Sequence, residues 1–407
     1  MPTSAPFDPS DRKGRVAVLA YTEYSWDPRV RREAEALRQD GYAVHVVSLR
    51  PKAGESTKHL DGVHIHEVPL IARRGGKARY LFQYSMFFLL ASAELLRLHL
   101  RRQIDLVHVH SLPDFLVFAA APLKVRGIPV ILDLHEAMPE IVSARMALPP
   151  RSFLVRGAAT LEKISVWFAD HVIVASDGIR SVVERRGLAT AKITTVYNPG
   201  DVSPVLPHAA ELKHRLSLPD GKLIVHAGGV NPERDLETLL KALAHLPSDE
   251  SVRLIIAGDG EAGYVKALQR LAETLGVSDR VRYVGKLSLQ DAHALMSLSS
   301  VGLVTLEHNP LTDVSWPTRI VEFAHLEKPL VVPRLRFIEQ ILGGAAQYYT
   351  PGDPKSLAEE LTQAFRAPED NRGAIERALL VVRRFGWSQM RSQLLAVVRN
   401  SGGRHAG

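Results

Sequence analysis

The stretch that decides the fold is DLVHVHSLPDFLVFAAAPLKVRGIPVILDLHEAMPE, residues 105–140. Two short runs of branched aliphatic residues, 106–109 and 130–132, flank a longer segment with a helical pattern. A strand, a helix and a second strand in this order predict a βαβ unit with parallel strands. Both runs end in polar residues, and α/β proteins bind their ligands beyond the carboxyl ends of such strands. This stretch therefore predicts a ligand site as well as a fold class.

The same alternation continues on both sides of this stretch within the first half of the chain. Further predicted strands are Val16–Ala20, Val44–Ser48 and Val172–Val174. A helix is predicted over residues 27–39, with Asp27 as its N-cap, Pro28 at its first position and Gly41 after its end. We expect this half of the chain to form one doubly wound α/β domain.

The alternation pauses at residues 198–207, where three prolines and a glycine predict an interdomain linker. It then restarts with predicted strands at Leu223–His226, Arg253–Ala257, Val281–Tyr283, Val301–Val304 and Leu330–Val332, and predicted helices at Leu236–Ala244, Tyr264–Leu275 and Leu289–Met296. The second half is therefore predicted to form a second doubly wound domain. Two such domains facing one another would place a ligand site in the cleft between them.

Bulk composition narrows the class of protein and its partners. The chain has 407 residues, 46% of them hydrophobic and 23% charged, as expected for a globular protein with two domains. It has no cysteine, and residues 1–13 lack the apolar core of a signal peptide, so we expect a cytoplasmic protein. The net charge of +7 favours anionic partners such as nucleotide diphosphates or anionic lipid. Dense basic runs interleaved with aromatic residues are absent, which argues against nucleic acid.

Residues 80–100 interrupt the α/β pattern with an apolar, aromatic segment. Glu94 and Arg97 interrupt it too early for a clean membrane span of about 20 apolar residues. Basic residues flank it on both sides: Arg73, Arg74, Lys77, Arg79, Arg101 and Arg102. Such a helix is typical of an interfacial membrane anchor, and it is equally typical of a buried helix on the flank of a sheet. Both interpretations stay open, and the first predicts peripheral membrane contact.

The first half offers polar side chains where two predicted strands end. His110 ends one strand, and Asp133, His135 and Glu136 follow the other. We expect His135 to contact a sugar hydroxyl or a phosphate, and the other three to lie on the acceptor side of the site. His108 and His110 share one strand face, but no third metal ligand is evident, so no metal is expected.

The second half offers a glycine turn followed by a cation. Gly228 and Gly229 follow the first predicted strand of that half, and Arg234 lies near the start of the next helix. Glycines allow a close approach of the backbone to a phosphate, and the amides of the helix N-terminus add to the binding of an anion. A tight turn with a solvated arginine is the simpler alternative.

A G-x-G-x-x-G sequence spans residues 258–263, directly after a predicted strand. Alone it would favour a dinucleotide and a dehydrogenase. The acidic residue expected about 20 positions later is not clearly placed, because Asp279 comes before the next strand. The motif also follows the second strand of its half and not the first, so we interpret it as a turn beside the phosphate or the base.

Residues 315–324, SWPTRIVEFA, predict a short helix that Pro317 begins. Thr318 and Arg319 could hold a diphosphate at its N-terminus, and Glu322, one turn later, could accept both hydroxyls of a ribose. An ion pair between Arg319 and Glu322 within the helix is the alternative.

In order and spacing, these segments resemble the family-4 retaining glycosyltransferases of the GT-B fold, from about Arg15 to Arg399. The resembling segments are DPRVRREAEALRQDGYAVHVVS, DLVHVHSLPDF, ILDLHEAMPE, VYNPGD, IAGDGE, SWPTRIVEFAHLEKPLVV and FGWSQM. The resemblance implies an α/β architecture of two Rossmann-like domains facing across a cleft. Residues 1–200 would bind the acceptor, residues 201–380 the nucleotide-sugar donor, and residues 381–407 would form a crossover helix and tail.

The resemblance also implies roles for individual residues. Glu322 corresponds to the carboxylate that binds the ribose of the donor, and Arg319 to a basic residue at the pyrophosphate. Arg234 corresponds to the lysine at the donor diphosphate, and His135 to the histidine near the transferred sugar. Asn198 corresponds to the asparagine of the hinge turn.

Two positions depart from the family pattern. Gly229 stands where the family usually has an arginine, and Val314 stands where the first glutamate of an E-x7-E pair would fall. The geometry at the donor phosphates is therefore expected to differ from that of the best-known members.

The resulting hypothesis is a hexosyltransferase-type enzyme that moves a sugar from a nucleotide-diphosphate donor to a glycan or lipid-linked acceptor with retention of configuration. His135, Arg234 and Arg319 would be the catalytic residues, and neither a cofactor nor a metal is expected. The enzyme would act in the synthesis of bacterial surface polysaccharide or cell-envelope glycan. Its location would be the cytoplasm, at the inner face of the plasma membrane. Three alternatives remain: a sugar-nucleotide epimerase using Asp133, Glu136 or Glu140, an NAD-dependent dehydrogenase, and a non-catalytic glycan- or lipid-binding scaffold.

Overall fold

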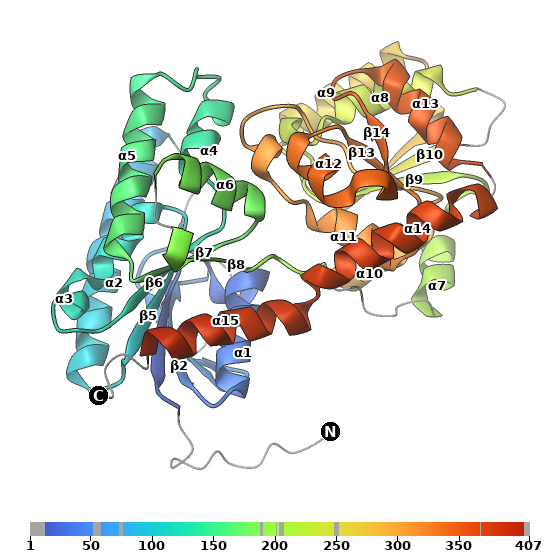
Figure 1. Cartoon of the computed structure of the whole chain (residues 1–407). Coiled ribbons are helices and arrows are strands. Elements are labelled where there is room, and N and C mark those ends of the chain that lie inside the picture. Colours follow the sequence, from blue (N-terminus) through green and yellow to red (C-terminus); the bar gives the residue numbers. More distant parts are fainter. Residues whose placement is uncertain are drawn as a thin grey trace. The chain divides into compact units, whose positions relative to one another are not determined.

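The computed structural model describes residues 13–51, 58–72, 76–187, 190–200, 202, 207–247, 252–366 and 368–402. The chain divides into two compact units. The first unit comprises Met1–Tyr197 and Ser388–Gly407, and the second comprises Asn198–Trp387. Helix α15 (Trp387–Gly402) is the last helix of the chain and returns it to the first unit, beside α1 and β2 (Figure 1).

The first unit is built on a sheet that has eight strands within the described residues, in the order β3-β4-β2-β1-β5-β6-β7-β8. The strands are β1 (Arg15–Leu19), β2 (Ala43–Leu49), β3 (His59–Leu60), β4 (Val63–Val68), β5 (Leu106–His110), β6 (Val130–Leu134), β7 (His171–Val174) and β8 (Ile193–Thr195). All neighbours are parallel except β3 and β4. Without β3, the strands run third, second, first, fourth and onward, which is the Rossmann order with its switch point between β1 and β5.

Helices cover this sheet and set the positions of its strand ends. They are α1 (Pro28–Gln39), α2 (Lys77–Leu100), α3 (Ala121–Lys124), α4 (Met138–Arg145), α5 (Phe153–Phe168), α6 (Asp177–Arg185) and the 3-10 turns η2 (Tyr24–Trp26), η3 (Asp114–Ala120) and η4 (Thr190–Lys192). The predicted start of α1 is confirmed, because the Asp27 side chain accepts hydrogen bonds from the amides of Arg29 and Val30.

The second unit repeats the same order with a sheet that the structure describes as two halves, β11-β10-β9 and β12-β13-β14. A bridge between Ile224 and Val301 joins the halves, so the full order is third, second, first, fourth, fifth, sixth. The strands are β9 (Leu223–Ala227), β10 (Arg253–Ala257), β11 (Val281–Gly285), β12 (Gly302–Leu303), β13 (Leu330–Pro333) and β14 (Gln347–Tyr349). The switch point of this unit therefore lies between β9 and β12.

The helices of the second unit pack around a continuous apolar core. They are α7 (Pro207–Arg215), α8 (Leu236–His245), α9 (Ala262–Thr274), α10 (Leu289–Ser297), α11 (Thr318–His325), α12 (Arg336–Leu342), α13 (Pro354–Ala364) and α14 (Pro368–Val382), with 3-10 turns η5 (Pro232–Arg234), η6 (Ser278–Arg280), η7 (Thr312–Val314), η8 (Gly343–Ala345) and η9 (Arg383–Phe385). The α/β architecture predicted from the sequence is thus confirmed in both units.

Two features of the first unit differ from the sequence expectation. The segment between β5 and β6 is mostly 3-10 helix, with only the four residues of α3 in α-helical form. Pro122 lies within it and has no amide to donate, which disfavours one long α-helix. Strands β3, β4 and β8 were not predicted; the sequence of β4, VHIHEV, has polar residues at three of six positions.

Asp114 is the first residue of η3, and its buried carboxyl group affects how the stability of the fold depends on pH. It is 1% exposed, and neither of its carboxylate oxygens has a hydrogen-bond partner among the described residues. Burial raises the pKa of Asp114 from 3.8 to about 8, and the nearby Glu162 raises it further, against the opposing charge of Arg186. The native state therefore binds more protons than the unfolded chain between these two pH values. The carboxyl group destabilises the fold increasingly as pH rises through that window, and fully above it.

We expect Asp114→Asn to raise the free energy of unfolding by about 2 kcal/mol near pH 9 and by much less near pH 4. Urea unfolding at both pH values measures the difference, with Glu359→Gln on an exposed face of α13 as the matched control. A gain of equal size at the two pH values would contradict the prediction.

Candidate functional site

The second unit contains a cavity of about 220 Å³ where β9 and β12 end. Its lining residues are His226, Ala227, Gly228, Gly229, Arg234, Leu303, Val304, Thr305, Pro317, Thr318, Arg319 and Phe323. This is the switch point of the sheet, where open α/β folds bind their ligands. Five residues predicted from the sequence to bind the donor, namely Gly228, Gly229, Arg234, Thr318 and Arg319, are brought together in this one cavity.

The loop after β9 is held in place by the loop after β10. The amide of Gly228 donates to the carbonyl oxygen of Ala257 at 2.9 Å, and the amide of Val230 donates to Asp259 at 2.8 Å. Gly228 has a φ of +152°, so its conformation favours glycine, and its missing side chain leaves backbone open to the cavity. The loop is therefore rigid backbone with a bare surface, as a phosphate cradle requires.

The G-x-G-x-x-G sequence has a packing role in this arrangement. A Cβ atom on Gly258 would lie 1.7 Å from the carbonyl oxygen of Gly228, and one on Gly260 would lie 2.3 Å from that of Val230. Gly263, in the first turn of α9, faces open space. The first two glycines therefore let the two loops touch, while the switch point lies at β9 and not at β10. This geometry gives the dinucleotide interpretation no support.

Arg234 reaches the cavity from the end of η5. The Thr305 hydroxyl, which follows β12, donates a hydrogen bond to the carbonyl oxygen of Arg234 at 2.6 Å. The next residue, Asp235, has a φ of +47° and turns the chain into α8. Residues from both sides of the switch point thus fix the backbone that carries this guanidinium.

Helix α11 begins at the cavity wall, with Thr318 and Arg319 in its first turn. Among the described residues no side chain caps this helix, since Pro317 at the N-cap has no side-chain hydrogen-bond acceptor. The amides of the first turn and the positive end of the helix dipole are then available to an anion. Together with Arg234 and Arg319, they make the cavity strongly cationic.

Glu322 lies one turn into α11 and does not line the cavity. It is 7% exposed, forms an ion pair with Arg319 and lies 3.7 Å from Nε2 of His293 on α10. Burial alone would raise the pKa of Glu322, but His293 and Arg319 outweigh burial and hold it below its usual value. The ion pair that the sequence offered as an alternative is therefore present, and Glu322 lies behind Arg319 as an ionised carboxylate.

His226 is a cavity residue for which the sequence predicted no role. Its Nε2 lies 3.2 Å from the carbonyl oxygen of Gly229, where the ring N–H donates. Burial lowers the pKa of His226 to about 4, and the charges of Arg234 and Arg319 lower it further. The imidazole is thus neutral near pH 7 and adds no positive charge to the cavity. A polar residue at the end of a buried strand was the signal that could have identified it.

The predicted acceptor-side residues lie in the first unit, near its own switch point. Asp133 is fully buried within β6, and the Nε and Nη2 atoms of Arg29 each donate to it at 2.9 Å. His110 Nδ1 lies 3.3 Å from Asp133 and 2.9 Å from Nε2 of His135. His110 and Asp133 are too buried to contact a sugar directly, whereas the side chain of His135 is 20% exposed and Glu136 is half-buried. The buried pair therefore holds His135, which reaches the surface.

Comparison with known proteins agrees with this architecture. Residues 29–203 match Glycosyltransferase Family 4, and residues 210–380 match Glycosyl transferases group 1. Among solved structures, sucrose-phosphate synthase of Thermosynechococcus elongatus superposes with a TM-score of 0.77 at 17% identity, covering 95% of this chain and 98% of that one. Anabaena HepE in complex with UDP superposes with a TM-score of 0.73 at 17% identity, covering 95% and 100%.

Curated relatives match over shorter stretches. The uncharacterised glycosyltransferase YqgM of Bacillus subtilis is 24% identical over 211 residues, which are 51% of this chain and 54% of the relative. The sulfoquinovosyl transferase SQD2 of Arabidopsis thaliana is 26% identical over 41% of this chain and 32% of its own length. The alignments thus span about a third to a half of these relatives. The D-inositol 3-phosphate glycosyltransferase of Mycobacterium tuberculosis is 31% identical over 34% of this chain and 32% of its own length.

A chain with two Rossmann-ordered units and a cationic cavity at the switch point of the second is a GT-B protein. This chain belongs to the glycosyltransferase group 1 family and carries a family 4 domain in its first half. It is a glycosyltransferase by membership, as the sequence resemblance predicted.

Proposed function

We propose that the protein transfers a hexose from a nucleotide-diphosphate donor to a glycan or lipid-linked acceptor with retention of the anomeric configuration. The observation that carries the proposal is the cavity where Arg234, Arg319, the bare Gly228–Gly229 backbone and the uncapped start of α11 converge. That combination suits two linked phosphates, which need several donors and positive charge at one place.

The chemistry follows from where charge develops. As the bond between sugar and phosphate breaks, the departing diphosphate gains negative charge, which Arg234, Arg319 and the α11 amides would stabilise. The hydroxyl of the acceptor attacks the same sugar face from which the diphosphate leaves, and its proton passes to the departing phosphate oxygen. No nucleophilic carboxylate and no metal at the phosphates is required, so we expect the rate to be independent of added Mg²⁺ or Mn²⁺. His135 would contact the transferred sugar from the first unit.

Glu322 fits a ribose-binding role in which the ligand shares the carboxylate with Arg319. Its ionised state makes it an acceptor for two hydroxyl groups. Gly200 permits the linker to pack over it, since a Cβ there would lie 3.1 Å from Cγ of Glu322. His293 and Arg319 orient the carboxylate before any ligand binds.

HepE has been solved with UDP-glucose, at a TM-score of 0.72 and 18% identity to this chain, which supports a UDP-sugar as the first donor to test. The experiment screens UDP- and GDP-sugars by thermal shift and then follows transfer, reading the anomeric configuration of the product by NMR. We expect nucleotide affinity to fall at least about tenfold in Glu322→Ala. Inverted product or unchanged nucleotide affinity would overturn the proposal. Product formed without an acceptor as an epimerised donor would favour the epimerase alternative.

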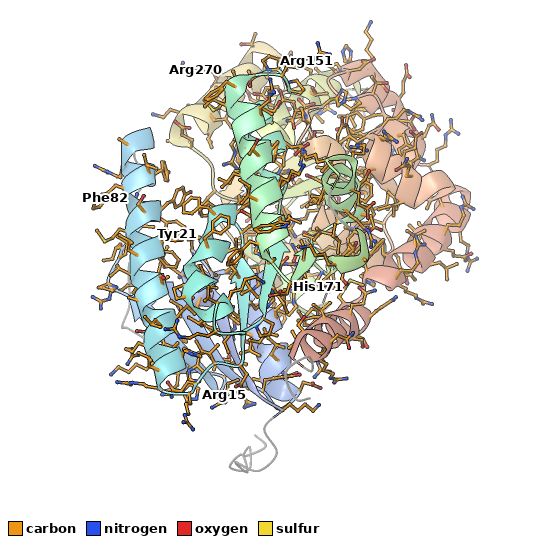
Figure 2. The ribbon with its side chains drawn as sticks, turned by 60° about the vertical axis from the view of Figure 1, so that its left-hand side comes forward. Arg15, Tyr21, Phe82, Arg151, His171 and Arg270 are labelled. Atoms are coloured by element: carbon orange, nitrogen blue, oxygen red, sulfur yellow. The ribbon has the colours of Figure 1, made fainter. Side chains whose placement is uncertain are left out.

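We propose further that the first unit sits on an anionic membrane surface on its cytoplasmic side, through α2 and α5. Within the described residues, one helix, Ala78–Leu100, is long and apolar enough to cross a membrane. Its inner face carries Phe87, Ala91, Leu95 and Leu98, which are fully buried, so the helix is part of the fold. Its outer face exposes Leu81 and Phe82 at 67% and 61%, and Figure 2 shows Phe82 pointing outward.

Helix α5 is a neighbour of α2 in the fold, because η3 packs against both helices. Phe153 and Trp167 of α5 are 88% and 75% exposed. Exposed basic residues on these helices or near their ends in the sequence are Arg101, Arg102, Arg145, Arg151, Arg156 and Lys163. Exposed aromatic residues together with exposed basic residues are typical of helices that lie in a membrane interface. Of the predicted flanking cations, Arg73 and Arg74 lie outside the described residues.

We expect Leu81→Glu with Phe82→Glu to lower partition onto vesicles of phosphatidylglycerol and phosphatidylcholine at least about tenfold. Both side chains are exposed, so the substitutions leave the fold intact, which circular dichroism checks. Leu289→Glu is the control, since that residue is equally exposed, at 65%, on the second unit. Equal binding of the double variant and the control would contradict the proposal.

A further inference from the structure

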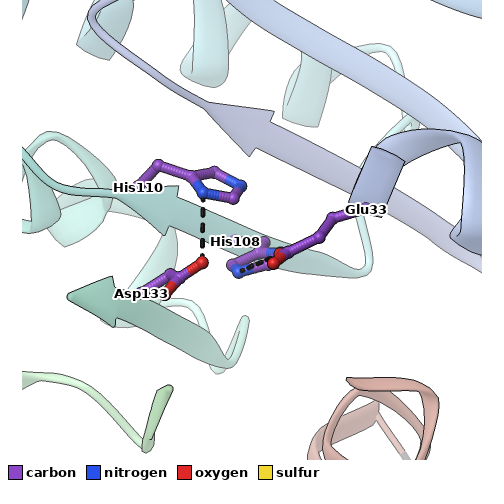
Figure 3. A group of neighbouring side chains, drawn as sticks. All are labelled: Glu33, His108, His110 and Asp133. Carbon is purple, nitrogen blue, oxygen red and sulfur yellow. Dashed lines mark ion pairs between the residues drawn. The ribbon is translucent and has the colours of Figure 1, made fainter. Parts of the chain in front are cut away.

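A second set of ligand atoms lies inside the first unit, away from the donor cavity. Glu33, His108, His110 and Asp133 each offer one donor atom, and these four atoms lie within 4.8 Å of one another. They come from α1, β5 and β6, and Figure 3 shows the four side chains turned toward one point. All four are buried.

Several polar atoms in this group have no hydrogen-bond partner among the described residues. They are both ring nitrogens of His108, Nε2 of His110 and one carboxylate oxygen of Glu33. His108 is 0% exposed, so bulk solvent does not reach its ring nitrogens. Leaving buried polar atoms unpaired costs about 1–3 kcal/mol each, so a ligand that pairs them is strongly favoured. A cation is the ligand that imidazole nitrogens and carboxylate oxygens share.

The spacing suits a tetrahedral ion. Bonds of about 2.1 Å to nitrogen and oxygen place the corners of a tetrahedron about 3.4 Å apart. His108 Nε2 lies 3.7 Å from Glu33, and His110 Nδ1 lies 3.3 Å from Asp133. Two imidazoles with two carboxylates form a donor set that zinc accepts.

Arg29 completes the site from outside. It donates to both oxygens of Asp133 and lies 3.2 Å from Glu33, which fixes the two carboxylates as outer partners of metal ligands do. A divalent ion and Arg29 together bring three positive charges. Glu33, Asp133 and the adjacent Asp27, whose charge also acts on Arg29, bring three negative charges. These charges balance with the ion in place, and Arg32 also acts on Glu33 from outside this count.

We propose that Glu33, His108, His110 and Asp133 bind one structural Zn²⁺ that ties α1 to the end of the first sheet. The ion would pair the carboxylate oxygen of Glu33 and one ring nitrogen of His108, which otherwise have no partner in the described part of the chain, and it would fix His110, which lies beside His135. This site is separate from the donor cavity and does not depend on the function proposed above. No third ligand was evident from the sequence because Glu33 lies 75 residues before His108 and Asp133 lies 25 residues after it.

The test measures zinc in the purified full-length protein by mass spectrometry and then replaces it with Co²⁺ after chelation. We expect about one zinc per chain, the visible absorption of tetrahedral Co²⁺, and a lower Tm after chelation that zinc restores. His108→Asn and Glu33→Gln should each reduce the zinc content at least about tenfold. The control is His64→Asn with His66→Asn, which removes two imidazoles from the separate histidine group on β2 and β4.

The outcomes separate cleanly. Stoichiometric zinc that is lost in His108→Asn and kept in the control supports the proposal. A folded wild-type protein that neither contains zinc nor takes up Co²⁺ would overturn it, as would equal zinc loss in the control. If His108→Asn does not fold, the absorption of the wild-type protein reconstituted with Co²⁺ decides, since it reports tetrahedral nitrogen and oxygen ligands without any variant.

Discussion

Gly258→Ala is expected to lower the free energy of unfolding by at least about 3 kcal/mol and to abolish donor binding. The added methyl group would lie 1.7 Å from the carbonyl oxygen of Gly228, which is rigid backbone and not the end of a flexible side chain. The φ of +151° adds conformational strain for any residue with a Cβ. Relief requires the loop after β9 to move away, and that loop forms one wall of the donor cavity.

Gly263→Ala is the matched control in the same motif. Its Cβ would meet nothing within 4 Å, and alanine favours the first turn of α9 that Gly263 occupies. We expect this variant to be neutral or slightly stabilising and fully active. Urea unfolding and nucleotide titration measure both variants. A dinucleotide-binding loop would need all three glycines, so equal losses in the two variants would contradict the packing role assigned to Gly258.

The cavity at the switch point of the second unit was predictable from the sequence because its parts follow strand ends. The glycine turn after β9 and the proline-started α11 carry local signals, and parallel strands bring their ends to one edge of a sheet. Those signals predict that Gly228, Arg234 and Arg319 lie together, as they do in the cavity. The local signals could not predict the second side chain that contacts Glu322. His293 comes from α10, and only the packing of α10 against α11 brings the two residues together.

The burial of charged residues in the first unit could not be predicted from the sequence for a related reason. The segment PRVRREAEALRQ of α1 is rich in charges and resembles a solvated helix face, yet Arg29 and Glu33 are 5% and 2% exposed. Such burial is tolerated only with a paired charge, and the pair of Arg29 is Asp133, 104 residues away. Periodicity reports which face of a helix is apolar. It does not report that an ion pair across the sheet permits a charged residue to enter the core.

Arg319→Met is expected to lower kcat/KM about 10²- to 10³-fold, because in the proposed function the guanidinium stabilises the negative charge that grows on the departing diphosphate. Steady-state kinetics with saturating acceptor measures the loss. Arg372→Met is the matched control, since Arg372 forms a 3.5 Å ion pair with Glu376 on α14, where both side chains are exposed, and it does not line the cavity that contains Arg319. We expect the control to retain full activity.

Loss of activity in Arg319→Met could also arise because Glu322 loses its ion-pair partner inside the protein. The variant Arg319→Met with Glu322→Gln separates the two causes, since it removes the unpaired charge as well as the guanidinium. If Arg319 acts on the diphosphate, the double variant stays at least about 10²-fold below wild type in kcat, whatever its stability. If Arg319 serves only to neutralise Glu322, kcat at saturating donor returns to the wild-type value in the double variant, and the catalytic assignment of Arg319 fails. The pair therefore distinguishes a group that stabilises the leaving phosphate from one that holds its neighbour.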